Sequence, residues 1–300
     1  MKSGKRSRSA GALAAALLLV TACGSSSAKL PSPLDLDIVT VGVKEYPGLF
    51  QNEGPDPVGF EESARNKIME NAGVKQSTPT WTRTNNWQSQ LADNKVHMVM
   101  GMISDTDTRA DDFRLARSYL RTDIGLLTLA NAKQVRNVKE LAGETICTVE
   151  RTSADETIKM IKQAVPLVPT TALTPEACIE KVKQGEAFAY STDRIILMGY
   201  TIDDNNVIRG KSVLQVLDLP LGREQHISIA LRKEHEEACR QLVKAIDTYV
   251  KSNHWLADLR AHLINEYERL APGNPRMTDK QIRDKFQPSV IDAERCTDQD

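Results

Sequence analysis

The sequence has little of three things: aromatic residues, excess charge of one sign, and long apolar runs. Aromatic side chains make up 5% of the 300 residues, so we expect a core built mainly from aliphatic side chains. The formal net charge is -1, which argues against a nucleic-acid-binding protein, because such proteins show a basic excess. The apolar run at 10–20 is shorter than the roughly 20 residues that a membrane-spanning helix needs, and no later segment is apolar enough.

Motifs of catalysis and metal binding are also missing. The sequence contains no G-x-S-x-G elbow and no Gly-rich phosphate-binding loop. Its five histidines are scattered, and no cysteine has the close Cys/His spacing of a zinc site. We therefore expect no catalytic residues, no metal and no cofactor, and we expect His97 and His226 to lie on surfaces or to act as hydrogen-bonding partners.

The N-terminal segment has the features of a bacterial lipoprotein signal. Basic residues at positions 2–8 precede the apolar run 10–20, and small residues then precede Cys23. This pattern predicts that residues 1–22 are removed and that Cys23 becomes an acylated first residue, which would anchor the chain at the extracytoplasmic face of the cell membrane. The alternative is an ordinary signal peptide with a chance cysteine.

Two further features suit an exported chain. Residues 23–36 are rich in Ser and Pro, which predicts a flexible tether. Four cysteines follow Cys23, an even number that predicts disulfides and allows three pairings. They are Cys147, Cys178, Cys239 and Cys296.

Hydrophobic periodicity predicts strands that alternate with helices. The expected strands are 37–43, 79–84, 96–102, 124–130, 145–149, 187–191, 213–216 and 227–231. The expected helices are 61–72, 86–92, 138–141, 153–164, 174–185, 194–200, 234–252 and 255–270. Ser153 is the expected N-cap of its helix, and Pro175 the first helical position of the next. The tail after Pro272 is polar and is expected to be irregular.

This alternation indicates an α/β protein with largely parallel sheets, and the length favours two lobes. We expect two crossing strands between the lobes, near residues 129–130 and 220–223. The predicted lobes are residues 37–128 with 224–270, and residues 129–223. Residues 271–300 would form a C-terminal extension.

Polar residues follow three predicted strands. Arg109 ends the loop after one strand, residues 150–153 lie between another strand and a helix, and Asp193 follows a third. Open α/β sheets bind ligands at such strand ends. A guanidinium, helix N–H groups and a carboxylate are the partners that an amino acid requires. Each residue also has a structural alternative: a surface arginine for Arg109, helix caps for Thr152, Ser153 and Asp193, and a solvated side chain for Lys44.

Six short segments, taken in order, resemble a known family. They are 41–48 (VGVKEYPG), 58–60 (VGF), 104–109 (SDTDTR), 138–143 (VKELAG), 219–222 (LPLG) and 252–255 (SNHW). Over about residues 39–259 the chain resembles the polar amino-acid solute-binding lipoproteins of ABC importers. The resemblance implies a type II periplasmic-binding fold, in which two α/β lobes are joined by two crossing strands with the ligand cleft between them.

The resemblance also implies roles for individual residues. Arg109 and Ser104 would bind the α-carboxylate, with Thr152 and Ser153 completing that pocket, and Asp193 would bind the α-ammonium. Further ligand contacts would come from Lys44, Thr84 and Thr192.

Actinobacterial glutamate-binding lipoproteins share further details with this chain. They carry cysteines in the segments that resemble 146–153 and 176–185, which implies a Cys147–Cys178 bond and leaves Cys239 to pair with Cys296. Lys44 matches a lysine in their first loop, which favours glutamate or aspartate over glutamine. Departures from the family pattern occur at Ser63, His97 and Arg151.

The expected function is therefore a monomeric, lipid-anchored receptor that delivers an amino acid to an ABC permease. One alternative is a sensor that signals to a membrane partner without transport. A remote alternative is a dehydratase-type enzyme on the same fold.

Overall fold

The computed structural model describes residues 31–52, 56–271, 273, 276–289 and 296. The predicted signal segment 1–22, the predicted lipidation residue Cys23 and the tether up to residue 30 lie outside these residues. None of the helices in the described part of the chain is long and apolar enough to cross a membrane.

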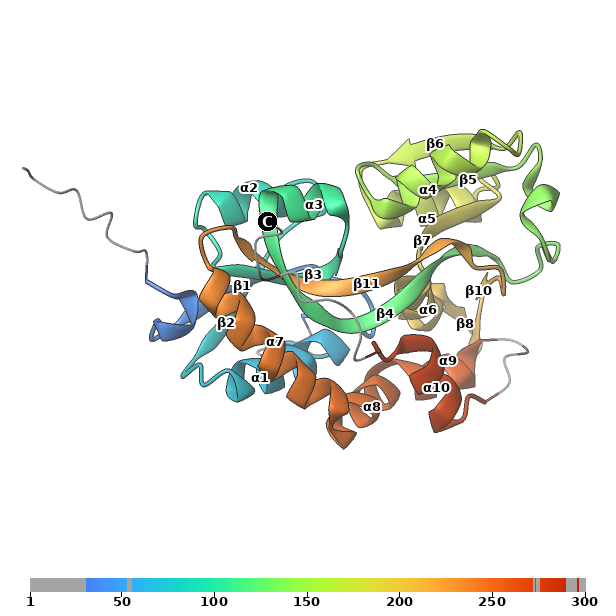
Figure 1. The fold of residues 1–300 in the computed structure, drawn as a ribbon. Helices are drawn as coiled ribbons and strands as arrows, with labels where there is room; N and C mark the ends of the chain where they lie inside the picture. Colours follow the sequence, from blue (N-terminus) through green and yellow to red (C-terminus); the bar gives the residue numbers. More distant parts are fainter. Residues whose placement is uncertain (1–30, 53–55, 272, 274–275, 290–295, 297–300) are drawn as a thin grey trace, which may run out of the picture. The chain divides into compact units, whose positions relative to one another are not determined.

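Two long antiparallel strands, β4 (Phe113–Leu129) and β11 (Leu221–Arg232), lie side by side at the centre of the main sheet (Figure 1). The strand order is β2-β1-β3-β11-β4-β7-β5-β6, and β10 (Leu214–Val216) also pairs with β4. The outer strands form two groups: β1 (Val39–Val43), β2 (Ser77–Trp81) and β3 (Met98–Ser104), and β5 (Thr145–Val149), β6 (Val168–Ala172) and β7 (Ala189–Asp193). A separate ribbon joins β8 (Val207–Ile208) and β9 (Lys211–Ser212).

Strands are parallel within each outer group, as expected, but β11 and β4 meet their neighbours antiparallel. Consequently β3 and β7 point in opposite directions and their carboxyl ends face each other. Ser104 and Leu120 both pair with Ile227 of β11, and Asp193 pairs with Ile124. Residues 120 and 124 are about 13 Å apart along β4, which sets the scale of the space between the two strand ends.

Each outer group has its own helices. α1 (Phe60–Asn71), α7 (Glu236–Lys251) and α8 (Asn253–Leu259) pack with the β1–β3 group, and α4 (Ser153–Lys162), α5 (Pro175–Lys183) and α6 (Arg194–Ile202) pack with the β5–β7 group (Figure 1). The shorter helices are η1 (Pro33–Asp35), α2 (Trp87–Ala92), α3 (Asp107–Asp112), η2 (Val138–Leu141), η3 (Asp204–Asn206), the π-helix η4 (Arg260–Ile264), α9 (Asn265–Leu270) and α10 (Asp279–Phe286).

The core is mainly aliphatic, as the composition predicts. Ile146, Ile158 and Leu167 are typical of the buried cluster in the β5–β7 group. Several aromatic side chains are also fully buried, and Trp255 is one of them: its Nε1 donates to the carbonyl oxygen of Tyr119 at 2.8 Å, so the indole N–H is satisfied.

Both implied disulfides are present. Cys147 of β5 bonds to Cys178 of α5, and Cys239 of α7 bonds to Cys296 near the chain end. Closing a loop with the 31-residue separation of the first bond stabilises the fold by roughly 3–4 kcal/mol in the chain-entropy view.

The structure corrects several predicted strands. β4 starts at Phe113, well before the predicted 124. The prediction missed its first half because Arg114, Arg117 and Arg121 interrupt the apolar pattern there. The first crossing segment therefore lies earlier than the predicted 129–130. β6 was not predicted, since VPTTA is short and contains a proline, and β2 spans Ser77–Trp81 rather than 79–84.

Two helix predictions were also wrong. Thr152, not Ser153, is the N-cap of α4, and its hydroxyl accepts from the Asp155 N–H at 3.1 Å. The tail after Pro272 is not irregular throughout, because α10 begins at a capping box formed by Thr278 and Gln281.

Candidate functional site

Four charged side chains meet where the two outer groups face each other. Lys44 follows β1, Glu61 lies in the first turn of α1, Arg109 lies in α3, and Asp193 ends β7. Lys44, Glu61 and Asp193 are each at most 6% exposed. Lys44 interacts electrostatically with each of the other three, so the fold assembles one cluster from four separate segments.

Lys44 is buried, and the neighbouring carboxylates only partly offset the cost of burying its charge. Burial and the nearby Arg109 guanidinium lower its pKa to about 7, although Glu61 and Asp193 oppose the shift. The alternative of a solvated lysine is therefore wrong.

Glu61 was not predicted to lie in the site. Its Oε1 accepts hydrogen bonds from the Met102 N–H at 3.0 Å and from the Tyr119 hydroxyl, while Oε2 has no partner within the described part of the chain. Burial raises the pKa of Glu61, and the two hydrogen bonds and Lys44 counteract this. An acid on the buried face of α1, beside Ala64 and Ile68, was the available sequence signal.

Arg109 is held in place from two sides. Its Nη1 donates to the carbonyl oxygen of Ser104 at 2.7 Å, and its guanidinium carbon lies 5.8 Å from the centroid of the Trp87 ring. Thr106 caps α3. Burial lowers the pKa of Arg109, and Asp193 is the largest opposing influence. A freely solvated surface arginine is not what the structure shows.

Hydroxyl groups connect the two sides of the site. Ser104 Oγ, at the end of β3, lies 3.3 Å from Ser153 Oγ at the start of α4. The Thr152 hydroxyl is engaged elsewhere, because it donates to the Val149 carbonyl oxygen at 2.8 Å and caps α4. The predicted ligand role of the Thr152 hydroxyl thus competes with these two hydrogen bonds.

Asp193 provides a carboxylate that faces the two cations. Burial raises its pKa to about 7, opposed first by Arg109 and then by Lys44. Asp193 occupies the N-cap position of α6 without a side-chain capping bond, and its Oδ1 has no partner among the described residues. A purely capping role does not fit. The adjacent Thr192 pairs with Gly125 of β4.

A cavity of about 500 Å³ opens beside Lys44. It is bordered by Tyr46, Trp81 and Thr84 on one side and by Leu173 and Glu176 on the other. Thr84, one of the predicted ligand contacts, lines this cavity together with Tyr46 and Lys44. Trp81 and Leu173 are exposed, at 43% and 72%.

Neither metal binding nor His97 gains support as part of this site. Groups of three or more metal-ligating side chains are not found within the described ranges. His97 accepts from the Thr40 N–H at 2.9 Å through Nδ1, which is the hydrogen-bonding role predicted for it.

Comparisons with known proteins bear on the family and the fold. Residues 39–262 match the model of the bacterial extracellular solute-binding proteins, family 3. The glutamate-binding protein GluB of Corynebacterium efficiens is 24% identical over 282 residues, which cover 89% of this chain and 95% of that protein. GluB of Corynebacterium glutamicum is 25% identical over 248 residues, covering 79% and 83%.

Solved structures share the fold. An ancestral arginine-binding protein bound to arginine aligns with a TM-score of 0.65 at 15% identity, covering 75% of this chain and 97% of that chain. The GluR0 ligand-binding core with L-glutamate aligns with a TM-score of 0.65 at 18% identity, covering 76% and 99%. The resemblance found in the sequence is thus confirmed for both the family and the type II periplasmic-binding fold. The chain belongs to family 3 of the bacterial extracellular solute-binding proteins.

Proposed function

We propose that this protein is a receptor for an amino acid, with glutamate or aspartate favoured. The observation that carries the proposal is the buried cluster of two cations, Lys44 and Arg109, in which Glu61 supports Lys44 and the Asp193 carboxylate has an oxygen without a partner among the described residues. Such a cluster is costly in an empty protein and matches a zwitterion with a second carboxylate.

The proposed pose places the α-carboxylate between the two sides of the site. Arg109 and Ser104 reach it from the β3 side, and Ser153 with the N-terminal N–H groups of α4 reaches it from the β7 side. Asp193, beside Thr192, takes the α-ammonium. Because the partners come from both outer groups, the bound ligand favours a closed arrangement of two lobes, one built on β1–β3 and the other on β5–β7.

Lys44 is proposed to select the side chain. It faces the cavity that Thr84 borders, so a side-chain carboxylate there would gain an ion pair in a water-poor site. A side-chain amide would not compensate the Lys44 charge. The names of the two GluB relatives agree with this selection.

Isothermal titration calorimetry of the purified protein with a panel of amino acids tests the proposal. We expect saturable binding of glutamate or aspartate, weaker binding of glutamine, and none of arginine. If no amino acid binds, the receptor hypothesis is wrong.

The cellular role rests on Cys23. We propose that acylation of Cys23 tethers the monomeric receptor outside the membrane, beside an ABC permease that receives the ligand. Uptake of labelled glutamate in a strain lacking the gene should fall, and mass spectrometry of the native protein should show acyl chains on Cys23. Unchanged uptake would contradict delivery and favour a sensor.

A further inference from the structure

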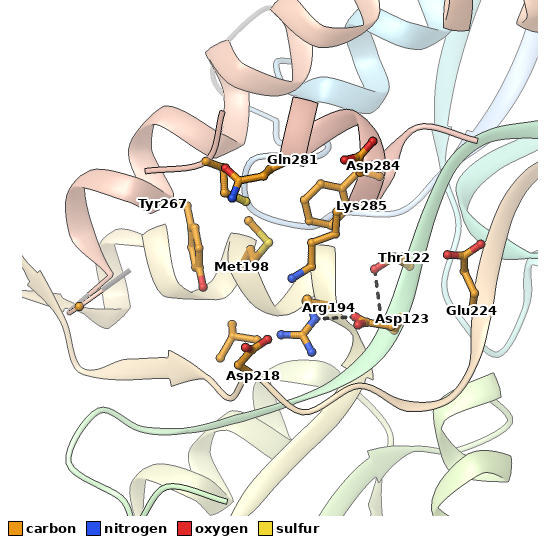
Figure 2. A pocket seen from close by; sticks show the side chains of 14 residues that line it. Thr122, Asp123, Arg194, Met198, Asp218, Glu224, Tyr267, Gln281, Asp284 and Lys285 are labelled. Carbon is orange, nitrogen blue, oxygen red and sulfur yellow. Dashed lines mark hydrogen bonds and ion pairs between the residues drawn. The ribbon is translucent and has the colours of Figure 1, made fainter. Parts of the chain in front are cut away.

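A second cavity lies away from the charged cluster. Its volume is about 710 Å³, and it is enclosed by β4, the start of α6, the segment before β11, and α10 (Figure 2). We call it the hinge-side cavity and define it by Asp123, Arg194, Met198, Asp218, Lys285 and Phe286. Arg194 directly follows Asp193, so adjacent residues serve the two separate sites.

Arg194 offers a spare donor to this cavity. The residue is 4% exposed; its Nε donates to Asp123 Oδ1 at 2.5 Å and its Nη1 to the carbonyl oxygen of Leu217 at 2.9 Å. Its Nη2 is buried and has no partner within the described residues. A buried guanidinium donor without an acceptor is costly, which points to a ligand that supplies the acceptor.

Lys285 supplies a second cation. Figure 2 shows its side chain extending from α10 toward Arg194. Burial, and then the charge of Arg194, lower the pKa of Lys285. No carboxylate of the described residues lies within ion-pair distance of its ammonium group.

Three of the acidic residues that line the cavity each form an ion pair with a basic side chain. Asp123 accepts from Arg194, Glu224 pairs with Arg121 at 3.3 Å, and Asp284 pairs with Lys280 at 2.5 Å. Asp218 is exposed at the rim. Among the residues that line this cavity, the buried group without a partner in the described part of the chain is therefore a donor, Arg194 Nη2.

Apolar side chains complete the cavity. Met198 and Phe286 are buried, and Met277 also lines it. A ligand that suits both the Arg194 and Lys285 donors and these apolar side chains would be a small anion with an apolar body.

We propose that the hinge-side cavity binds a small organic carboxylate, whose oxygens accept from Arg194 Nη2 and Lys285 Nζ while its apolar part lies against Met198 and Phe286. The ligand would bridge α6 and α10. α10 is in turn held to η4 by the Arg260–Asp279 ion pair at 2.7 Å, so the site is formed by segments that the fold keeps in place.

Benzoate and its neutral amide, benzamide, are suitable probes. Calorimetry of the purified protein, at constant ionic strength, should show saturable binding of benzoate and at least roughly tenfold weaker binding of benzamide, because only the carboxylate accepts charge-assisted hydrogen bonds. Lys285→Gln should weaken benzoate binding roughly tenfold or more and leave glutamate binding unchanged.

Lys244→Gln is the matched control, because Lys244 is an exposed lysine on α7 outside both sites. It should change neither titration. The proposal is overturned if benzoate does not bind the unaltered protein, if benzamide binds equally well, or if Lys285→Gln has no more effect than Lys244→Gln. Benzoate binding also does not depend on Arg109, so it remains measurable in an Arg109 variant that has lost glutamate binding.

Discussion

Arg109 Nη1 donates to the carbonyl oxygen of Ser104 at 2.7 Å, so one arm of the guanidinium is fixed by the strand end that precedes it. The guanidinium also interacts electrostatically with the Asp193 carboxylate. A lysine could not both make this backbone contact and present a planar pair of donors to a carboxylate.

Arg109→Lys should therefore weaken glutamate binding by roughly ten- to a hundredfold, the loss of one or two charge-assisted hydrogen bonds. Calorimetry measures the change, and circular dichroism checks that the fold is retained. Arg136→Lys, at an exposed position, is the matched control and should bind normally. Equal affinities for the two variants would exclude Arg109 from the site.

Lys44→Met should remove the preference for an acidic side chain. Methionine keeps much of the buried volume while removing the charge that a side-chain carboxylate needs. We expect the affinity ratio of glutamate to glutamine to fall by roughly tenfold or more. Lys139→Met, on an exposed position, should leave the ratio unchanged. A retained preference in Lys44→Met would assign selectivity to other residues.

Proton exchange on binding should report Lys44 and Asp193 directly, since each has a pKa of about 7. At pH 7 the ligand ammonium lowers the Asp193 pKa and releases up to about half a proton, while a ligand side-chain carboxylate raises the Lys44 pKa and takes up a similar amount. Glutamate should show little net exchange, and glutamine should show net release. Calorimetry in buffers of different ionisation enthalpy measures both, and equal exchange for the two ligands would refute the assignment.

Asp193→Asn should have opposite effects on glutamate binding and on stability: weaker binding, and a relative gain in thermal stability as the pH rises. The folded pKa of Asp193, about 7, exceeds its ordinary value of 3.8, so its contribution to the free energy of unfolding falls as pH rises from about 4 to 7. Asparagine does not titrate, so the thermal midpoint of the variant relative to the unaltered protein should increase over that range. The variant should bind glutamate at least roughly tenfold more weakly, because the α-ammonium loses its counter-charge. A midpoint difference that is flat with pH would contradict the burial of this carboxylate.

Glu61→Gln tests the residue that sequence reasoning missed. Burial raises the Glu61 pKa, so the unaltered protein should lose stability relative to the variant as pH rises above 4.5. Gln keeps an oxygen for the Met102 N–H and the Tyr119 hydroxyl but removes the charge that supports Lys44. Glutamate binding should then weaken most at high pH, where Lys44 is neutral. Glu62→Gln is not a suitable control, because Glu62 forms a buried ion pair with Arg65. Glu70→Gln is suitable, because Glu70 is exposed and its ion pair with Lys67 lies at the surface.

Local sequence patterns predicted much of the fold. The helix at 61–72 and the strand at 145–149 each correspond to an observed element, because their periodicity and caps are encoded within a few residues. β4 was predicted only in its second half, since its first half carries arginines that tertiary partners stabilise, as Asp247 does for Arg117 at 2.7 Å. β6 has little apolar burial and so left no clear pattern.

By itself, the sequence indicated the family and the candidate ligand residues after three strands, because motifs and strand ends are local features. The cysteines alone left three disulfide pairings open, and the two pairs were implied only by the resemblance to actinobacterial glutamate-binding lipoproteins. Only the tertiary structure decided that Glu61 joins Lys44, that the Thr152 hydroxyl serves as a cap, and that Arg194 and Lys285 share a cavity. These relationships depend on burial and on contacts between segments distant in the chain, and both arise only when β4 and β11 bring the two groups of strands together.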